Sequence, residues 1–157
     1  MEFTVANPVT ATTYKDTPEG AFLDKILRGE ISAVEAYDQV LTKMDSPVQV
    51  DRLREFKLEH EDTVRQMRSL VRSEGQAPSE NSGPWGTIVL SFVNMAKMVG
   101  FETALRALLE GEEHGLNQYR EALTMNLSQK ERDLIINVLV PRQERHISSL
   151  RAMIKFQ

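Results

Sequence analysis

Two related stretches, GEISAVEAY at residues 29–37 and GEEHGLNQY at residues 111–119, lie 82 positions apart in the chain. Each contains a Gly-Glu pair and, seven residues after the glutamate, a tyrosine. Seven residues are close to two turns of an α-helix, so the carboxylate and the tyrosine of each copy fall on one helix face. The repeat therefore indicates two similar helices, each with a carboxylate and a phenol on the same side.

Capping residues and prolines mark four long helices. Thr17 and Ser46 each precede a proline, which is typical of a helix start, and Ser128 is placed to form a capping box with Glu131. No run shows the sustained alternation of period two that is typical of strands, and short connections favour antiparallel neighbours. The sequence predicts an all-α, antiparallel four-helix bundle, with helices at roughly residues 17–44, 46–75, 101–125 and 128 to near the C-terminus.

The chain has 157 residues, which is enough for one domain with a buried core. We expect residues 1–16 to form a flexible tail and residues 17–157 to form a single bundle domain. The apolar run WGTIVLSFVNMAKMVG at residues 85–100 is shorter than the ~20 residues of a membrane-spanning helix. We expect a short extra helix at about residues 85–99 in a long crossover, covering an end of the core or a subunit contact. A homodimer is the expected assembly.

Composition and motifs narrow the possible functions. The net charge of −4 gives no general attraction to nucleic acids or anionic membranes. The absence of cysteine excludes disulfides, thiolate metal sites and thiol catalysis, and it fits a reducing compartment. The chain shows neither a nucleotide-binding glycine loop nor a serine-nucleophile motif, and His114 is interpreted as a surface residue. With no signal-peptide pattern at residues 1–16, we expect a cytoplasmic protein without nucleic-acid or membrane partners.

Each expected helix carries one candidate metal ligand in its apolar stripe: Glu30 on the first, His60 on the second, Glu112 on the third and His146 on the fourth. A lone buried carboxylate is very costly, so polar groups at one depth of a bundle must satisfy one another or hold a cation. Two carboxylates and two imidazoles suit Fe, Mn or Zn. The alternative is that each histidine is a hydrogen-bonded core residue and each glutamate reaches solvent.

At these residues the chain resembles the ferritin-like superfamily, which includes rubrerythrins and bacterioferritins. The superfamily pattern is Glu on helices one and three and Glu-x-x-His on helices two and four. GEISAVEAY is similar to the rubrerythrin-type motif Glu-x-x-Ala-x-x-x-Tyr, and GEEHGLNQY differs in having Gly115 in place of the alanine. More narrowly, GPWGTIVLSFVNMAKMVG followed by ALLEGEEHGLNQYREAL resembles an uncharacterised family of small bacterial ferritin-like proteins, for which no activity is implied.

The resemblance implies that Glu30 and Glu112 match the terminal carboxylates of a di-iron site and that His60 and His146 match its histidines. The two bridging glutamates are replaced by Lys57 and Gln143. A lysine charge at this place and the loss of two carboxylates argue against two divalent cations, and the sequence predicts that a di-iron centre is lacking. The expected cofactor is therefore none, or a single Fe, Mn or Zn ion.

The neighbouring glutamates are not expected to replace the bridging carboxylates, because each lies about 100° or more of helical turn from the core direction; these are Glu59, Glu61, Glu113 and Glu144. A kink at Pro141 would change that register. Lys57 is expected to point into the bundle and pair with Glu30 or Glu112.

Tyr37 and Tyr119 are expected to pack in the core with their hydroxyls toward the carboxylates. They could also serve as redox or hydrogen-bonding partners of a metal.

Two classes of function fit these residues. The first, favoured by the Lys57 and Gln143 replacements, is a ferritin-like scaffold with a degenerate metal site that acts by assembly or partner binding. The second is an oxidoreductase-like protein that holds one metal ion and handles oxygen or peroxide.

Overall fold

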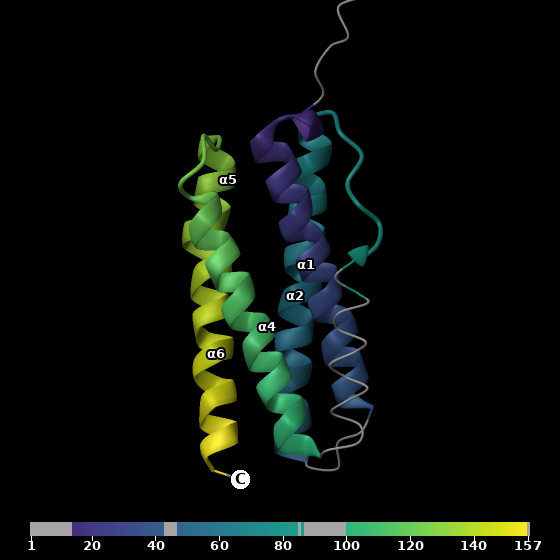
Figure 1. Cartoon of the computed structure of the whole chain (residues 1–157), viewed down its shortest axis with the longest axis vertical. Coiled ribbons are helices and arrows are strands. Elements are labelled where there is room, and N and C mark those ends of the chain that lie inside the picture. Colours follow the sequence, from purple (N-terminus) through teal and green to yellow (C-terminus); the bar gives the residue numbers. More distant parts are fainter. Residues whose placement is uncertain (1–13, 43–46, 85, 87–99, 157) are drawn as a thin grey trace, which may run out of the picture.

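The computed structural model describes residues 14–42, 47–84, 86 and 100–156. Within these ranges every regular element is helical, as the sequence predicted. The elements are the 3₁₀ helix η1 (Tyr14–Asp16), α1 (Pro18–Leu41), α2 (Pro47–Ser73), α4 (Phe101–Ala122), α5 (Gln129–Leu134), the π-helix η2 (Ile135–Leu139) and α6 (Val140–Lys155). α5, η2 and α6 follow one another without a gap and form one continuous rod. With α1, α2 and α4, this rod makes up the bundle in Figure 1.

α1 lies against α2 and α4, α6 lies against α4, and α2 also contacts α6. Figure 1 places the beginning of α1 and the end of α2 at one end of the bundle, and the beginning of α4 at the other. Residues 74–100, which connect α2 to α4, therefore join opposite ends of the molecule.

The helix boundaries follow from local capping chemistry. The Thr17 side chain accepts a hydrogen bond from the Gly20 N–H at 3.0 Å, and Ser128 and Glu131 form the predicted capping box. Beyond the end of α2, Gly75 has a φ of 74°, which favours glycine and stops the helix. α1 and α4 each end about three residues earlier than the sequence pattern suggested.

Part of the expected tail is structured. Residues Tyr14–Asp16 form η1, and the Tyr14 hydroxyl donates a hydrogen bond to Glu131 at the start of α5. The regular structure thus begins before residue 17. Residues 1–13 and, apart from Gly86, the expected crossover helix lie outside the described residues.

Buried apolar side chains form two clusters along the bundle axis. One contains Leu23, Ile26, Leu27, Val64, Met67, Tyr119, Ala122, Leu127, Ile135 and Leu139. The other contains Tyr37, Val40, Leu53, Phe56, Leu105, Leu108 and Leu150. The buried polar residues Glu30, His60, Glu112 and His146 lie at sequence positions between those of the two clusters on every helix. A polar layer therefore divides the core.

The segment after α2 is attached to the side of α1 by hydrogen bonds. Ser79 Oγ donates to Asp24 at 2.7 Å, and Ser82 Oγ donates to Glu35 at 2.8 Å. Asp24 also pairs with Lys15 and Arg28, both at 3.1 Å. These contacts place residues 79–82 along α1.

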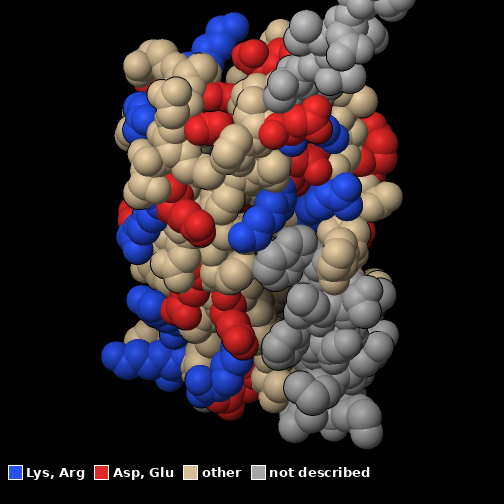
Figure 2. Space-filling view, turned by 45° about the horizontal axis from the view of Figure 1, so that its top comes forward, with Lys and Arg blue, Asp and Glu red and all other residues tan. Residues whose placement is uncertain are grey.

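Charged side chains are mixed on the surface. On the face seen in Figure 2, acidic and basic groups are interspersed and form no extended area of one sign. Several are paired across helices, as in Arg120 with Glu144 and Arg151 with Glu113.

No helix within the described residues is long and apolar enough to cross a membrane.

Candidate metal centre

The four candidate ligands predicted from the sequence meet in the middle of the bundle, and each is at most 4% exposed. His60 lies between two carboxylates: its Nδ1 is 2.8 Å from Glu30 Oε2, and its Nε2 is 3.1 Å from Glu112 Oε1. His146 Nδ1 is 3.3 Å from the same Glu112 oxygen. Glu112 is therefore the residue on which the two imidazoles converge.

A fifth residue, Glu59, extends the cluster on the side of α6. Its Oε2 is 2.7 Å from His146 Nε2, and its carboxylate also pairs with Arg145. Glu59 was expected not to replace a bridging carboxylate; the structure places it instead at the outer nitrogen of His146. A position about 100° around α2 from His60 faces the seam with α6, and the outer nitrogen of the His146 ring points to that seam.

The two tyrosines of the repeat bind the two glutamates crosswise. The Tyr37 hydroxyl, from α1, donates to Glu112 on α4, and the Tyr119 hydroxyl, from α4, donates to Glu30 on α1. Both phenol rings are 1% exposed. The hydroxyls point toward the carboxylates, as expected, and each copy of the motif satisfies the carboxylate of the other copy.

The cluster carries its own positive charge. Burial alone disfavours a protonated His60, but the carboxylates of Glu112 and Glu30 outweigh burial and raise the pKa of His60 to about 10. Burial would likewise raise the pKa of Glu112, but the His60 charge and the two imidazole hydrogen bonds hold that pKa well below its usual range. At neutral pH, in the absence of a metal ion, His60 is therefore an imidazolium between two carboxylates.

Lys57 does not enter the cluster. Its ammonium pairs with Asp38 at 2.6 Å and with Glu61 at 3.3 Å, and its side chain is 22% exposed. The prediction of a buried pair with Glu30 or Glu112 was wrong. The four-carbon stem lies along the bundle while the charge reaches the surface, which costs less than burying it.

Replacing Lys57 by methionine is accordingly expected to change the free energy of unfolding by at most about 1 kcal/mol, since only solvent-screened ion pairs are lost. Urea unfolding of the parent and of Lys57→Met measures the difference. A loss of about 3 kcal/mol or more would show instead that the ammonium compensates the buried carboxylates.

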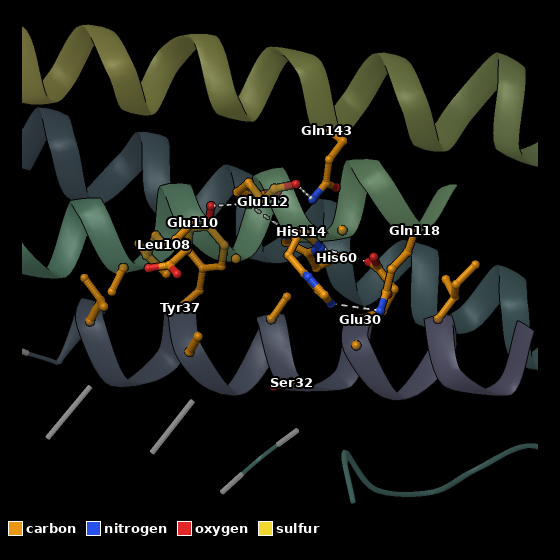
Figure 3. A pocket seen from close by; sticks show the side chains of 18 of the residues that line it. Glu30, Ser32, Tyr37, His60, Leu108, Glu110, Glu112, His114, Gln118 and Gln143 are labelled. Atoms are coloured by element: carbon orange, nitrogen blue, oxygen red, sulfur yellow. Dashed lines mark hydrogen bonds and ion pairs between the residues drawn. The ribbon is translucent and has the colours of Figure 1, made fainter. Parts of the chain in front are cut away.

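Gln143 occupies the seam between α6 and α4 without joining the carboxylates. Its Nε2 donates to the backbone carbonyl of Glu112 at 3.0 Å, as Figure 3 shows. A Cβ atom at Gly115 would lie 2.7 Å from that nitrogen. The glycine that replaces the alanine of the motif therefore makes room for this amide.

The π-helix η2 adjusts the register of the fourth rod. The N–H of Val140 bonds to the carbonyl of Ile135, five residues earlier, directly before Pro141. Proline cannot donate its own backbone bond, and a single widened turn accommodates it within a continuous helix. The change of register that was considered for Pro141 is therefore present. His146 lies about one and a half turns after Pro141.

A cavity of about 280 Å³ adjoins the cluster. It lies mainly between α1 and α4, and Glu30, His60 and Glu112 form part of its wall (Figure 3). His114, on the surface as expected, stands at this cavity beside Gln118, with 3.0 Å between their side-chain nitrogens. The polar cluster is thus in contact with this cavity.

Three of these residues can serve as a metal site. One donor atom each from His60, Glu112 and His146 lie within 4.8 Å of one another. All three residues are buried. Two imidazole nitrogens and a carboxylate oxygen are a donor set found at Zn, Fe and Mn centres.

Comparison with protein families gives a match. The model of a family described as a domain of unknown function (DUF2383) matches residues 19–125. Those residues contain Glu30, Glu59, His60 and Glu112, whereas His146 lies beyond them. No curated protein and no solved structure matches the chain.

Proposed function

The chain belongs to the family of the domain of unknown function DUF2383, and we propose that it is a ferritin-like antiparallel four-helix bundle that binds one divalent transition-metal ion. The ligands are His60 Nε2, His146 Nδ1 and the carboxylate of Glu112. Fe, Mn and Zn are the ions that this donor set suits.

The arrangement of the two imidazoles carries the proposal. Each ring presents one nitrogen to Glu112 and the other to a separate carboxylate, Glu30 for His60 and Glu59 for His146. Histidines that bind metals commonly donate their second ring N–H to a carboxylate, which fixes the tautomer and the direction of the free nitrogen. Glu30 and Glu59 are in position to do this for both rings.

The separations of the donor atoms also fit an ion. Glu112 Oε1 is 3.1 Å from His60 Nε2 and 3.3 Å from His146 Nδ1. Two ligands bound at about 2.0–2.1 Å in a tetrahedral site lie roughly 3.3–3.4 Å apart. The separations of Glu112 from the two histidines therefore suit a small divalent cation.

The residues support one ion rather than two. Lys57 turns to the surface and the Gln143 amide is bound to a backbone carbonyl, so neither supplies a bridging oxygen. Glu30 and Glu59 are hydrogen-bonded to the outer nitrogens of the histidines. A second cation would have to break these bonds.

The arrangement of the rods supports the ferritin-like part of the proposal. Glutamates come from the first and third rods and histidines from the second and fourth, as in that superfamily. The connection between α2 and α4 joins opposite ends of the bundle (Figure 1), as a long crossover does.

A bound ion would supply Lewis-acid chemistry or, for Fe and Mn, redox chemistry toward oxygen or peroxide. The chain itself provides the cavity of about 280 Å³ through which a small reactant reaches Glu112. It also provides Tyr37, whose hydroxyl orients the Glu112 carboxylate.

A second candidate function is a scaffold without metal that acts by assembly or partner binding. It is supported by the His60 charge, because an imidazolium between Glu30 and Glu112 compensates these carboxylates without an ion. Self-association as a homodimer belongs to this proposal, with the apolar residues 85–99 as the contact.

Thermal unfolding with added metal distinguishes the two candidates. An ion that binds only the folded state stabilises it by about 2.7 kcal/mol at a hundredfold excess over its dissociation constant. We expect Zn²⁺, Mn²⁺ or Fe²⁺ to raise the melting temperature of the parent and of His114→Gln, whose histidine lies outside the cluster. His146→Gln, which lacks one ligand, should show no such rise. Equal shifts in all three proteins would place the metal elsewhere and favour the scaffold.

A further inference from the structure

The cavity beside the cluster has its own architecture. Alanines of α1 and α4 form much of its apolar wall: Ala33, Ala36, Ala104 and Ala107. Its volume of about 280 Å³ exceeds the ~150 Å³ of an engineered apolar cavity that binds benzene. It is therefore large enough for a small organic molecule.

Two glycines of the repeat lie at the cavity. Gly29 and Gly111, the first residues of the two repeated stretches, both line it. Within the described part of the chain, a Cβ at Gly111 would have no atom within 4 Å, and one at Gly29 would meet only Gln118 Oε1 at 3.5 Å. A glycine inside a helix costs roughly 0.5–1 kcal/mol relative to alanine. Among the described residues, packing therefore demands glycine at neither position, and neither residue places a side chain in the space.

A buried hydroxyl group also lies in the cavity wall. Ser32 is 3% exposed and lines the cavity. Its Oγ has no hydrogen-bond partner among the described residues. A buried hydroxyl without a partner is costly, and a ligand that donates or accepts one hydrogen bond would remove that cost.

We propose that this cavity is a binding site for a small neutral molecule with an apolar body and one hydroxyl group. The alanine walls contact the apolar body, and Ser32 Oγ binds the hydroxyl. Anions are disfavoured because Glu30, Glu110 and Glu112 all line the space. The site goes beyond the proposed metal function and does not require an ion.

Three probes test the proposal, each with one benzene ring but a different substituent: phenol, benzene and benzoate. Calorimetric titration of the full chain, as purified and after EDTA treatment, should show saturable binding of phenol and benzene but not of benzoate. Ser32→Ala should weaken phenol binding by about 2- to 12-fold, the equivalent of one hydrogen bond, and leave benzene binding unchanged. Ala33→Leu should abolish both, because the larger side chain occupies the cavity.

Ala21→Leu, the same substitution at an exposed position of α1, is the matched control and should bind all probes as the parent does. Circular dichroism of each variant establishes that it is folded. Failure of phenol to saturate the parent would overturn the proposal, and so would binding that survives Ala33→Leu. An equal loss of phenol and benzene affinity in Ser32→Ala would overturn the role of the hydroxyl. Since the EDTA-treated protein is included, these outcomes are independent of metal binding.

Discussion

Replacing Glu112 by glutamine is expected to lower the free energy of unfolding by about 3–5 kcal/mol, the range for removing one partner of a buried ion pair. Glu112 is 2% exposed and accepts hydrogen bonds from Tyr37 and His60, with His146 also in contact. The amide cannot balance the His60 charge. In addition, the NH₂ group of the new amide and the protonated His60 ring are both hydrogen-bond donors, so neither can accept from the other.

Glu113→Gln provides the matched control at the adjacent position. Glu113 pairs with Arg151 at the surface, where its side chain is 43% exposed, so its loss should cost no more than about 1 kcal/mol. Urea unfolding monitored by circular dichroism compares the three proteins. Equal stability of Glu112→Gln and Glu113→Gln would refute the account of a charge-compensated core.

The metal-free protein is expected to lose stability as the pH rises from 7 to 9. The pKa of His60 is raised in the folded state to about 10 from an ordinary value of 6.5. The stabilisation that this shift provides is therefore complete below the unfolded pKa and disappears as the pH rises through the folded pKa. Between the two values the free energy of unfolding should fall by roughly 1.4 kcal/mol per pH unit, or about 2–3 kcal/mol from pH 7 to 9.

Metal should reverse this pH dependence. An ion at His60 Nε2 needs the unprotonated nitrogen, so its affinity increases as the proton leaves. Urea unfolding at several pH values, with EDTA and with added Zn²⁺, measures both slopes. His114→Gln should keep the slope of the parent in EDTA, and Glu30→Gln should reduce it because one of the two charges that raise the His60 pKa is gone. A flat profile for the parent in EDTA would contradict the buried imidazolium.

The repeat predicted the central part of the site. The seven-residue spacing of Glu30 and Tyr37, and of Glu112 and Tyr119, depends only on helical geometry, and the helices carry these residues on one face as expected. The sequence did not show that each tyrosine would bind the glutamate of the other helix. That contact depends on how α1 and α4 lie against each other, which spacing along one helix does not determine.

For two charged residues of α2, the angular position on the helix did not predict where the charged group lies, because their side chains are long. Lys57 falls in the apolar stripe, yet its flexible stem carries the ammonium to Asp38 at the surface. Glu59 falls outside the stripe, yet its carboxylate reaches His146 across the seam with α6. In both cases the angular position of the Cα atom was a poor guide to the position of the charge.

The cavity had no clear signal in the sequence. Gly29 and Gly111 were visible as part of the repeat, but an isolated glycine in a helical pattern indicates a close backbone contact as readily as an open space. Only the structure shows that a side chain at Gly111 would meet none of the described atoms. That the Ser32 hydroxyl has no hydrogen-bond partner among the described residues is likewise visible only in the packed bundle.

Metal content tests the central claim most directly. The protein is purified without chelator, and Fe, Mn and Zn are measured by mass spectrometry together with the protein concentration. A variant with both His60→Gln and His146→Gln, shown by circular dichroism to be folded, is treated in the same way. The account predicts about one ion per chain in the parent, as expected for a single set of ligands, and almost none in the double variant. A parent without metal, or a double variant with as much metal as the parent, would contradict it.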